Sequence, residues 1–280
     1  MSATRARLVF LCNRPFALEA ALGWADVEIV AVFTSAASTE VHAVCRRAGI
    51  PWTEWHKGSV EPIIDAACKG AARIIVSNGY PWIIPATLLA LPRIAVVNLH
   101  PSLLPAGRGP HPVNHAILAG LGVTGATCHY VDCGLDTGNI LAQCRYLIPP
   151  DATAADLYRP LFRLEVEALR LALPRILAGD PGDPQPADGA STYRRSKADM
   201  CFDWSEPAPV CHRRVRAFNI PKLGVAGQLA DGRRLRAFAS TIAADAADAL
   251  APGACRGDGH ALLVGTGRGV LRLDRFVWEP

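Results

Sequence analysis

The stretch RIAVVNLHPSLLPAGRGPHP, residues 93–112, decides the fold and points to a site. Its apolar start, RIAVVNL, shows no polar alternation, which is typical of a strand covered on both faces of a parallel sheet. The strand ends in Asn98 and His100, which are two positions apart, so their side chains leave the same face. Because open parallel sheets bind ligands at the carboxyl ends of their strands, we expect a site here.

Similar apolar runs alternate with helical stretches through the first half of the chain. ARLVFLC (6–12), VEIVAVFTS (27–35) and ARIIVSNG (72–79) read as strands, and FALEAALGW (16–24), STEVHAVCRRAG (38–49) and VEPIIDAACKG (60–70) read as helices. Strand–helix alternation predicts an α/β fold with a Rossmann-like, doubly wound and mainly parallel sheet. The first strand–helix junction, CNRPFALEA, lacks both the G-x-G-x-x-G and the Walker patterns, which argues against an NAD enzyme.

The composition changes towards the end of the chain. The segment GDPGDPQPADGA, residues 179–190, has the composition of a linker, and the short strand-like pieces after it predict a small β-rich C-terminal domain. We therefore predict a site-bearing domain at 1–178, a linker at 179–191 and the second domain at 192–280. Residues 192–280 hold 14 Lys and Arg against 9 Asp and Glu, whereas residues 1–191 hold 15 against 16. This excess of positive charge fits a basic solvated face, and contacts with phosphate or other anions are the alternative.

Several classes of protein and site are disfavoured. The nine cysteines form no C-x-x-C pair and no zinc-ligand spacing, so no metal is predicted, and this cysteine usage suits the cytoplasm. The apolar run near the start, LVFLC, is too short for a signal peptide. No apolar segment reaches 18 residues, so no membrane span is expected.

Three polar residues could carry chemistry. An Asn amide donates hydrogen bonds without charge and a His exchanges protons near neutral pH, so Asn98 and His100 suit an oxyanion formed on a carbonyl. Asp136 lies in the glycine-flanked loop DCGLDTGNI and, if the fold brings it to His100, would orient the imidazole. Taken singly, the three residues fit a turn cap, a structural histidine and a turn former equally well.

The combination of these motifs resembles one family. N-x-H-P-S-L-L-P at 98–105, R-G at 108–109 and L-D-T-G at 135–138 are similar to the formyltransferases that use N10-formyltetrahydrofolate. The resemblance covers residues 5–178 and extends weakly over 202–219. It implies that an acceptor amine attacks the formyl carbon, that Asn98 and His100 stabilise the tetrahedral oxyanion, and that Asp136 holds His100 and helps to remove the proton.

The resemblance also implies residues for binding. SNGYPWIIP (77–85) matches the loop whose backbone holds the pterin ring of the formyl donor, and Asp132-Cys133-Gly134 matches the other lip of that pocket. The implied donor-binding residues are Asn78, Gly79, Tyr80, Pro81, Trp82, Ile83, Ile84, Leu104, Asp132, Cys133 and Gly134. Those implied for the acceptor are Ser102, Arg108 and His111.

The acceptor stays open between several classes. Methionyl-tRNA formyltransferases carry a basic insertion after the second strand that FTSAASTEVHAVCRR (33–47) lacks, so a small amine, and above all a nucleotide-linked amino sugar, is our main hypothesis. Methionyl-tRNA, an amino acid such as N-hydroxyornithine, and water in a formyltetrahydrofolate hydrolase are the alternatives, and a binding module without catalysis is a further one. Relatives that modify sugars suggest a homodimer.

Overall fold

The computed structural model describes residues 5–220, 223–243, 250–257 and 260–280. The chain divides into two compact units. The first comprises the described residues up to 109 together with 125–146 and 160–192. The second comprises 110–124, 147–159 and the described residues from 193 onwards, so it draws on three separate segments of the chain.

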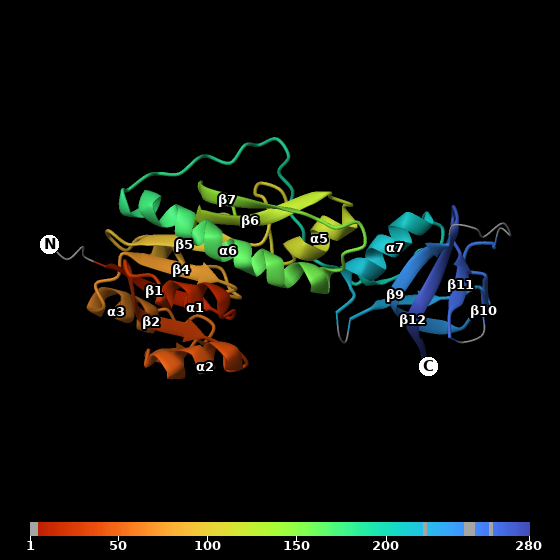
Figure 1. The fold of residues 1–280 in the computed structure, drawn as a ribbon, viewed down its shortest axis with the longest axis horizontal. Coiled ribbons are helices and arrows are strands. Elements are labelled where there is room, and N and C mark those ends of the chain that lie inside the picture. Colours follow the sequence, from red (N-terminus) through yellow and green to blue (C-terminus); the bar gives the residue numbers. More distant parts are fainter. Residues whose placement is uncertain (1–4, 221–222, 244–249, 258–259) are drawn as a thin grey trace. The chain divides into compact units, whose positions relative to one another are not determined.

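A seven-stranded sheet forms the centre of the first unit, in the order β3-β2-β1-β4-β5-β6-β7 (Figure 1). The strands are β1 (Ala6–Cys12), β2 (Val27–Thr34), β3 (Trp52–Glu54), β4 (Ile74–Asn78), β5 (Ala95–His100), β6 (Val123–Tyr130) and β7 (Ile140–Leu147). The first five pair in parallel, whereas β5 and β6 are antiparallel.

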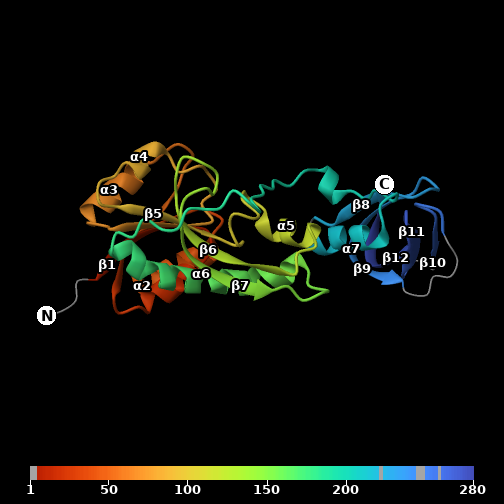
Figure 2. The same cartoon turned by 90° about the horizontal axis from the view of Figure 1, so that it is seen from above.

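Helices cover both faces of this sheet (Figure 2). One face packs against α1 (Phe16–Leu22), α2 (Thr39–Ala48) and α6 (Ala154–Leu177), and the other against α3 (Glu61–Lys69) and α4 (Ala86–Leu89). Alternate residues of one strand serve the two faces: Ile74 and Val76 pack towards α6, and Ile75 packs towards α3. Burial on both faces explains why these strands read as continuous apolar runs.

The strand order changes direction between β1 and β4, which lie side by side and parallel in the sheet. From β1 it proceeds outwards through β2 to β3, and then returns to β4 on the other side of β1. In such folds the crevice beyond the carboxyl ends of these strands binds ligands. Here the loops that follow β1 and β4 are tied together, because the Asn13 side chain donates to the Gly79 carbonyl at 3.2 Å and the Asn13 backbone N–H donates to the Asn78 carbonyl.

The second unit has its own sheet and helices. Five antiparallel strands lie in the order β10-β11-β12-β9-β8. They are β8 (Val225–Gln228), β9 (Arg234–Ala243), β10 (Cys255–Gly257), β11 (Leu262–Gly265) and β12 (Val270–Glu279), and they are accompanied by α5 (Pro112–Leu118), α7 (Ala208–Ala217) and a 3-10 turn, η1 (Ala198–Met200). The buried Asn114 amide of α5 donates to the Ala217 carbonyl, which ties α5 to the end of α7.

The predicted fold class is confirmed: an α/β domain with a mainly parallel sheet is joined to a small β-rich C-terminal part. The predicted boundaries at 178 and 191 stay a prediction, and the second unit also takes in residues 110–124, which include α5, and residues 147–159, which include the first turns of α6. The segment predicted as a linker makes specific bonds to the first unit. Asp183 and Ile140 exchange two backbone hydrogen bonds, and the Arg108 backbone N–H donates to the Ser191 carbonyl at 2.9 Å.

Candidate active site

The end of β5 carries the two residues singled out from the sequence. Asn98 is half-buried and His100 is buried, and both side chains lie on the face of the sheet that Val96 shares with α3 and α4. The antiparallel neighbour β6 places His129 opposite Asn98 and Thr127 opposite His100. The site is therefore built where a parallel strand meets an antiparallel one.

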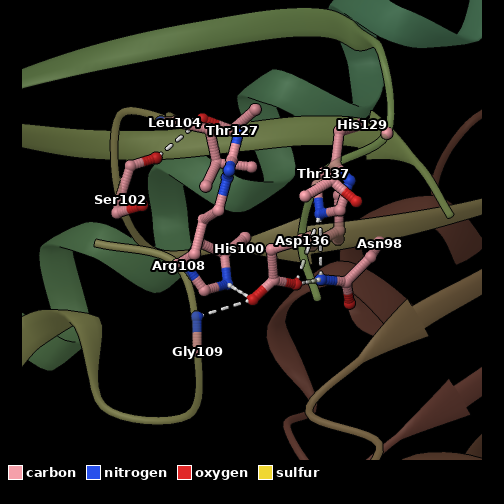
Figure 3. Close-up of polar contacts among 12 residues, drawn as sticks. Asn98, His100, Ser102, Leu104, Arg108, Gly109, Thr127, His129, Asp136 and Thr137 are labelled. Carbon is pink, nitrogen blue, oxygen red and sulfur yellow. Dashed lines mark hydrogen bonds and ion pairs between the residues drawn. The ribbon is translucent and has the colours of Figure 1, made fainter. Parts of the chain in front are cut away.

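Asp136 reaches this strand end from the loop between β6 and β7 (Figure 3). Its Oδ2 accepts the Gly109 backbone N–H at 2.8 Å and lies 3.7 Å from His100 Nδ1. Its Oδ1 accepts from Asn98 Nδ2 at 3.4 Å. The structure thus brings together the three residues that the sequence could only suggest.

The His100 ring is fixed from its other side. Its Nε2 lies 2.9 Å from the Gly107 carbonyl, which can only accept, so Nε2 carries a hydrogen. The remaining nitrogen, Nδ1, faces the Asp136 carboxylate. The hydrogen bond to Gly107 thus fixes the orientation of the ring and directs Nδ1 to the carboxylate, as in a catalytic His–Asp pair.

Sequence reasoning missed His129, which shares this cluster. Its Nδ1 donates to the Tyr130 carbonyl at 2.7 Å, so its neutral Nε2 accepts a hydrogen bond from Asn98 Nδ2 at 3.2 Å. Burial, followed by the nearby His100, lowers the pKa of His129 to about 4, and the Asp136 carboxylate only partly opposes this shift. A neutral His129 therefore turns the Asn98 amide nitrogen towards Asp136. Only the pairing of β5 with β6 could have identified His129, and a single sequence does not reveal this pairing.

The L-D-T-G loop needs glycine for reasons of space. A Cβ on Gly138 would collide with the Tyr130 carbonyl, and one on Gly134 would collide with the Thr137 hydroxyl. Asp132 closes the loop by accepting the Gly134 backbone N–H and the Thr137 hydroxyl, the latter at 2.7 Å. Asp132, Cys133 and Gly134 are all exposed in this loop, and their implied contact with the donor stays a prediction.

The stretch implied to bind the donor divides into buried and exposed residues. The Asn78 side chain is fully buried and donates to Glu165 of α6 at 2.9 Å, which turns it away from the Asn98 face. Ile84 belongs to the core, whereas Ile83 is 82% exposed. Tyr80 and Trp82 stand edge to face with ring centres 5.5 Å apart.

The other implied donor and acceptor residues have defined partners. Leu104 is buried, its N–H donates to the Thr127 hydroxyl and its carbonyl accepts from the Gln143 amide. These contacts attach the S-L-L-P loop to β6 and β7. The Ser102 hydroxyl donates to the Ala106 carbonyl at 2.8 Å within the same loop. These contacts show a folding role for both residues and leave their ligand contacts as predictions.

Arg108 and His111 lie in different units. Arg108 donates from Nε and one Nη to the Gln185 side-chain oxygen at 3.1 and 2.7 Å. His111 is the N-cap residue that precedes α5 in the second unit, where burial and then Arg195 lower its pKa. Their predicted contacts with the acceptor remain predictions.

Two negative observations apply to the part of the chain that the structure describes. Within it, no three or more His, Cys, Asp or Glu side chains gather in a way that could hold a metal ion. None of the helices in that part combines the length and the apolar character needed to cross a bilayer.

Comparison with known proteins matches both parts of the chain to one family. The family described as "Formyl transferase" matches residues 12–173, and "Formyl transferase, C-terminal domain" matches residues 194–279. The chain belongs to the formyl transferase family. The family resemblance drawn from the sequence is therefore confirmed.

The relatives include curated methionyl-tRNA formyltransferases. That of Nitrosococcus oceani is 38% identical over 208 residues, which span 72% of this chain and 63% of the relative. That of Bordetella petrii is 40% identical over 231 residues, spanning 76% and 72% of the two chains. The match to the first of these thus covers less than two thirds of that relative's length.

Solved structures share the fold at low sequence identity. An N-formyltransferase from Helicobacter canadensis in complex with folinic acid and dTDP-3-aminofucose is 17% identical, with a TM-score of 0.74 and coverage of 97% of this chain and 100% of that one. HypX from Aquifex aeolicus in complex with tetrahydrofolic acid is 19% identical, with a TM-score of 0.66 and coverage of 99% and 45%. At these identities the likeness establishes the fold alone.

Proposed function

We propose that this chain transfers a formyl group from N10-formyltetrahydrofolate to a primary amine at the Asn98–His100–Asp136 cluster. The observation that carries the proposal is the convergence of these three side chains at one strand end in a member of the formyl transferase family. Structural neighbours that hold tetrahydrofolic acid or folinic acid support a folate as the donor.

The cluster suits attack on a formyl carbon. Asn98 Nδ2 and His100 Nδ1 both face the Asp136 carboxylate at 3.4 and 3.7 Å, which are long for hydrogen bonds. In the proposed reaction a formyl oxygen accepts from the Asn98 amide and from Nδ1 of His100, which acts as the imidazolium. As the amine nitrogen bonds to the formyl carbon, the carbonyl oxygen gains negative charge, which these donors stabilise. Asp136 accepts the proton shed by the amine.

The second half of the reaction restores the carbonyl. The bond between the formyl carbon and N10 breaks, its electron pair goes to N10, and the proton taken from the amine balances N10 as an N–H. The products are a formamide and tetrahydrofolate, and no proton is gained or lost overall. His100, held between Gly107 and Asp136, can keep its extra proton through the step.

Residues 80–84 could hold the flat pterin ring of the donor. The rings of Tyr80 and Trp82 give this stretch an apolar wall, with Trp55 edge-on to each of them. Within the described residues, the backbone N–H groups of Trp82 and Ile83 donate no hydrogen bond, so they offer the donor edge that a heterocycle needs.

For the acceptor, we propose the amino group of methionyl-tRNA. This is the acceptor in the names of relatives that are 34–40% identical over about three quarters of the chain, and it therefore has better support than the amino sugar that the sequence favoured. The excess of Lys and Arg in residues 192–280 is compatible with phosphate contacts.

A nucleotide-linked amino sugar is the second candidate, because one specific feature favours it. Only residues 35–38 separate β2 from α2. Hydrogen bonds hold this short connection in place: the Ser38 hydroxyl donates to the Asn13 side chain at 2.7 Å and contacts the Ser35 hydroxyl at 2.9 Å. This connection, Ser-Ala-Ala-Ser, contains no basic residue and lacks the basic insertion that the resemblance implies for tRNA-specific members.

Release of tetrahydrofolate from N10-formyltetrahydrofolate tests the proposal when measured with methionyl-tRNA, with dTDP-3-aminofucose or with no acceptor. We expect release that depends on methionyl-tRNA, accompanied by formylated aminoacyl-tRNA. Dependence on the sugar would establish the second candidate, and release without an acceptor would establish a hydrolase. His100→Ala should lower turnover by about two to four orders of magnitude, whereas the exposed His56→Ala serves as the matched control. Near-normal turnover in His100→Ala would refute the mechanism.

A further inference from the structure

Gln185 uses its whole side chain to join the two loops around the cluster. Its Nε2 donates to the Asp136 carbonyl at 2.9 Å and to the Gly138 carbonyl at 2.8 Å. Its Oε1 accepts two hydrogen bonds from the Arg108 guanidinium. Both amide hydrogens and both lone pairs of the oxygen are thereby engaged.

The backbone of Asp136 needs such support. Its φ of 55° lies in the left-handed region, which is costly for a residue with a Cβ. The Asp136 carboxylate points correctly only while this backbone conformation persists, because Oδ2 must meet both the Gly109 N–H and His100. Hydrogen bonds to the carbonyls on both sides of Thr137 hold the conformation in place.

The same segment also supports His100 from the opposite side. The Ser191 hydroxyl accepts the Gly107 backbone N–H at 2.8 Å, and the Ser191 backbone bonds to Pro105 and Arg108. Gly107 is the residue whose carbonyl accepts from His100. Residues 185–191 therefore contact the loops that position both members of the His100–Asp136 pair.

Other contacts hold this segment to the first unit without Gln185. The Arg175 guanidinium pairs with Asp180 at 2.7 Å and with Asp183 at 3.0 Å. The Tyr130 hydroxyl donates to the Asp180 carbonyl, and the Asn139 amide donates to the Pro181 carbonyl at 2.9 Å. Loss of Gln185 should therefore change the local geometry at Asp136 while the segment stays attached.

We infer that Gln185 is a positioning residue for formyl transfer, which acts by holding the Asp136 loop against Arg108. This inference rests on the proposed function, because it assigns Gln185 its effect through Asp136. Residues 185–191 then help to position the active-site loops, in addition to connecting two parts of the chain.

A double-mutant cycle tests the inference. Gln185→Ala should lower kcat by about 10- to 100-fold, because a displacement of about 1 Å at a reacting group costs this much, and KM for the formyl donor should stay within about threefold because no donor contact is removed. In the Asp136→Ala background, Gln185→Ala should have no further effect on kcat. Gln185→Glu provides a second variant, since it loses both donors to the carbonyls and keeps the acceptor for Arg108.

Asn139→Ala is the matched control, because it removes an amide-to-carbonyl bond to Pro181 while both Gln185 bonds to the Asp136 and Gly138 carbonyls remain. It should keep wild-type kcat. Unchanged kcat in Gln185→Ala, or an equal loss of kcat with and without Asp136, would overturn the inference while leaving the proposed function intact. Full activity of Asp136→Ala itself would refute the proposed site, and the inference with it.

Discussion

Two asparagines at the ends of neighbouring strands lie on opposite faces of the sheet, one in the core and one in the candidate active site. Asn78 ends β4, and Asn98 lies near the end of β5, with Ser77 as its direct neighbour across the sheet. Since Asn78 follows Ser77 by one position, its side chain leaves the opposite face. The Asn78 amide donates to the buried Glu165 of α6, whereas the Asn98 amide donates to His129 and Asp136.

The difference lies in what covers each face. On the Asn78 side, α6 closes over the strand end, and Glu165 there is buried between Asn78 and the Arg14 guanidinium, which lies 2.8 Å away. On the Asn98 side, strand β6 supplies His129 and the loop after it supplies Asp136, and the amide is left half-buried. The same residue type thus contributes to stability on one face and is available to a ligand on the other.

Removing each amide in turn tests this comparison, and we expect the largest effect here. Asn98→Ala should lower turnover by about two to four orders of magnitude, because it removes a donor to the developing oxyanion. Asn78→Ala should lower the free energy of unfolding by about 1–3 kcal/mol, because Glu165 loses a buried hydrogen-bond partner. Single-turnover tetrahydrofolate release and chemical denaturation of both variants provide the two readouts.

The ratio of the two effects decides the outcome. We expect the loss of turnover in Asn98→Ala to exceed that in Asn78→Ala by at least about 100-fold, and the order of the stability losses to be reversed. Equal losses of turnover would mean that both strand ends act in catalysis, and the division between the two faces would then be wrong.

Glu165 sharpens the comparison through pH. Burial raises the pKa of this carboxyl to about 7, against the opposing influence of Arg14 and Asn78. Between its ordinary pKa and about 7, the folded chain keeps a proton that the unfolded chain has lost, so this group stabilises the fold less as the pH rises. Relative to Glu165→Gln, the free energy of unfolding of the wild type should fall by about 3 kcal/mol over this range.

Urea titrations at several pH values measure this difference. Comparison with the variant is necessary because the lowered pKa of His129 acts in the opposite direction: its contribution to stability falls as the pH drops from about 6.5 to about 4. The exposed Glu40→Gln serves as a control and should leave the slope unchanged. A wild-type slope parallel to that of Glu165→Gln would contradict a raised pKa at Glu165.

The sequence predicted what depends on periodicity and motif, and missed what depends on pairing. Continuous apolar runs predicted the parallel strands, and N-x-H with L-D-T-G pointed to Asn98, His100 and Asp136. It could not reveal His129, which lies opposite Asn98 only because β5 and β6 are antiparallel in one register. Gln185 was hidden for another reason: a segment rich in Gly, Pro and Asp has the composition of a free linker even when its bonds are specific.

The smallest effect is expected at His129, which supports the amide of Asn98 and stays neutral. His129→Phe removes the acceptor for one Asn98 N–H and leaves Asp136 to hold the other, so kcat should fall by about 10-fold, the worth of one modest hydrogen bond.

The pH profile of the same variant tests whether His129 stays neutral. Because the pKa of His129 lies at about 4, kcat should be lower by the same factor at every pH between 6 and 9, and no inflection should appear or disappear. His42→Phe is the matched control, since His42 is buried in the same unit and stacks on Trp52. An inflection between pH 6 and 7 that disappears only in His129→Phe would show that His129 exchanges a proton during turnover. His129 of β6 would then be a catalytic residue and not only a support for Asn98.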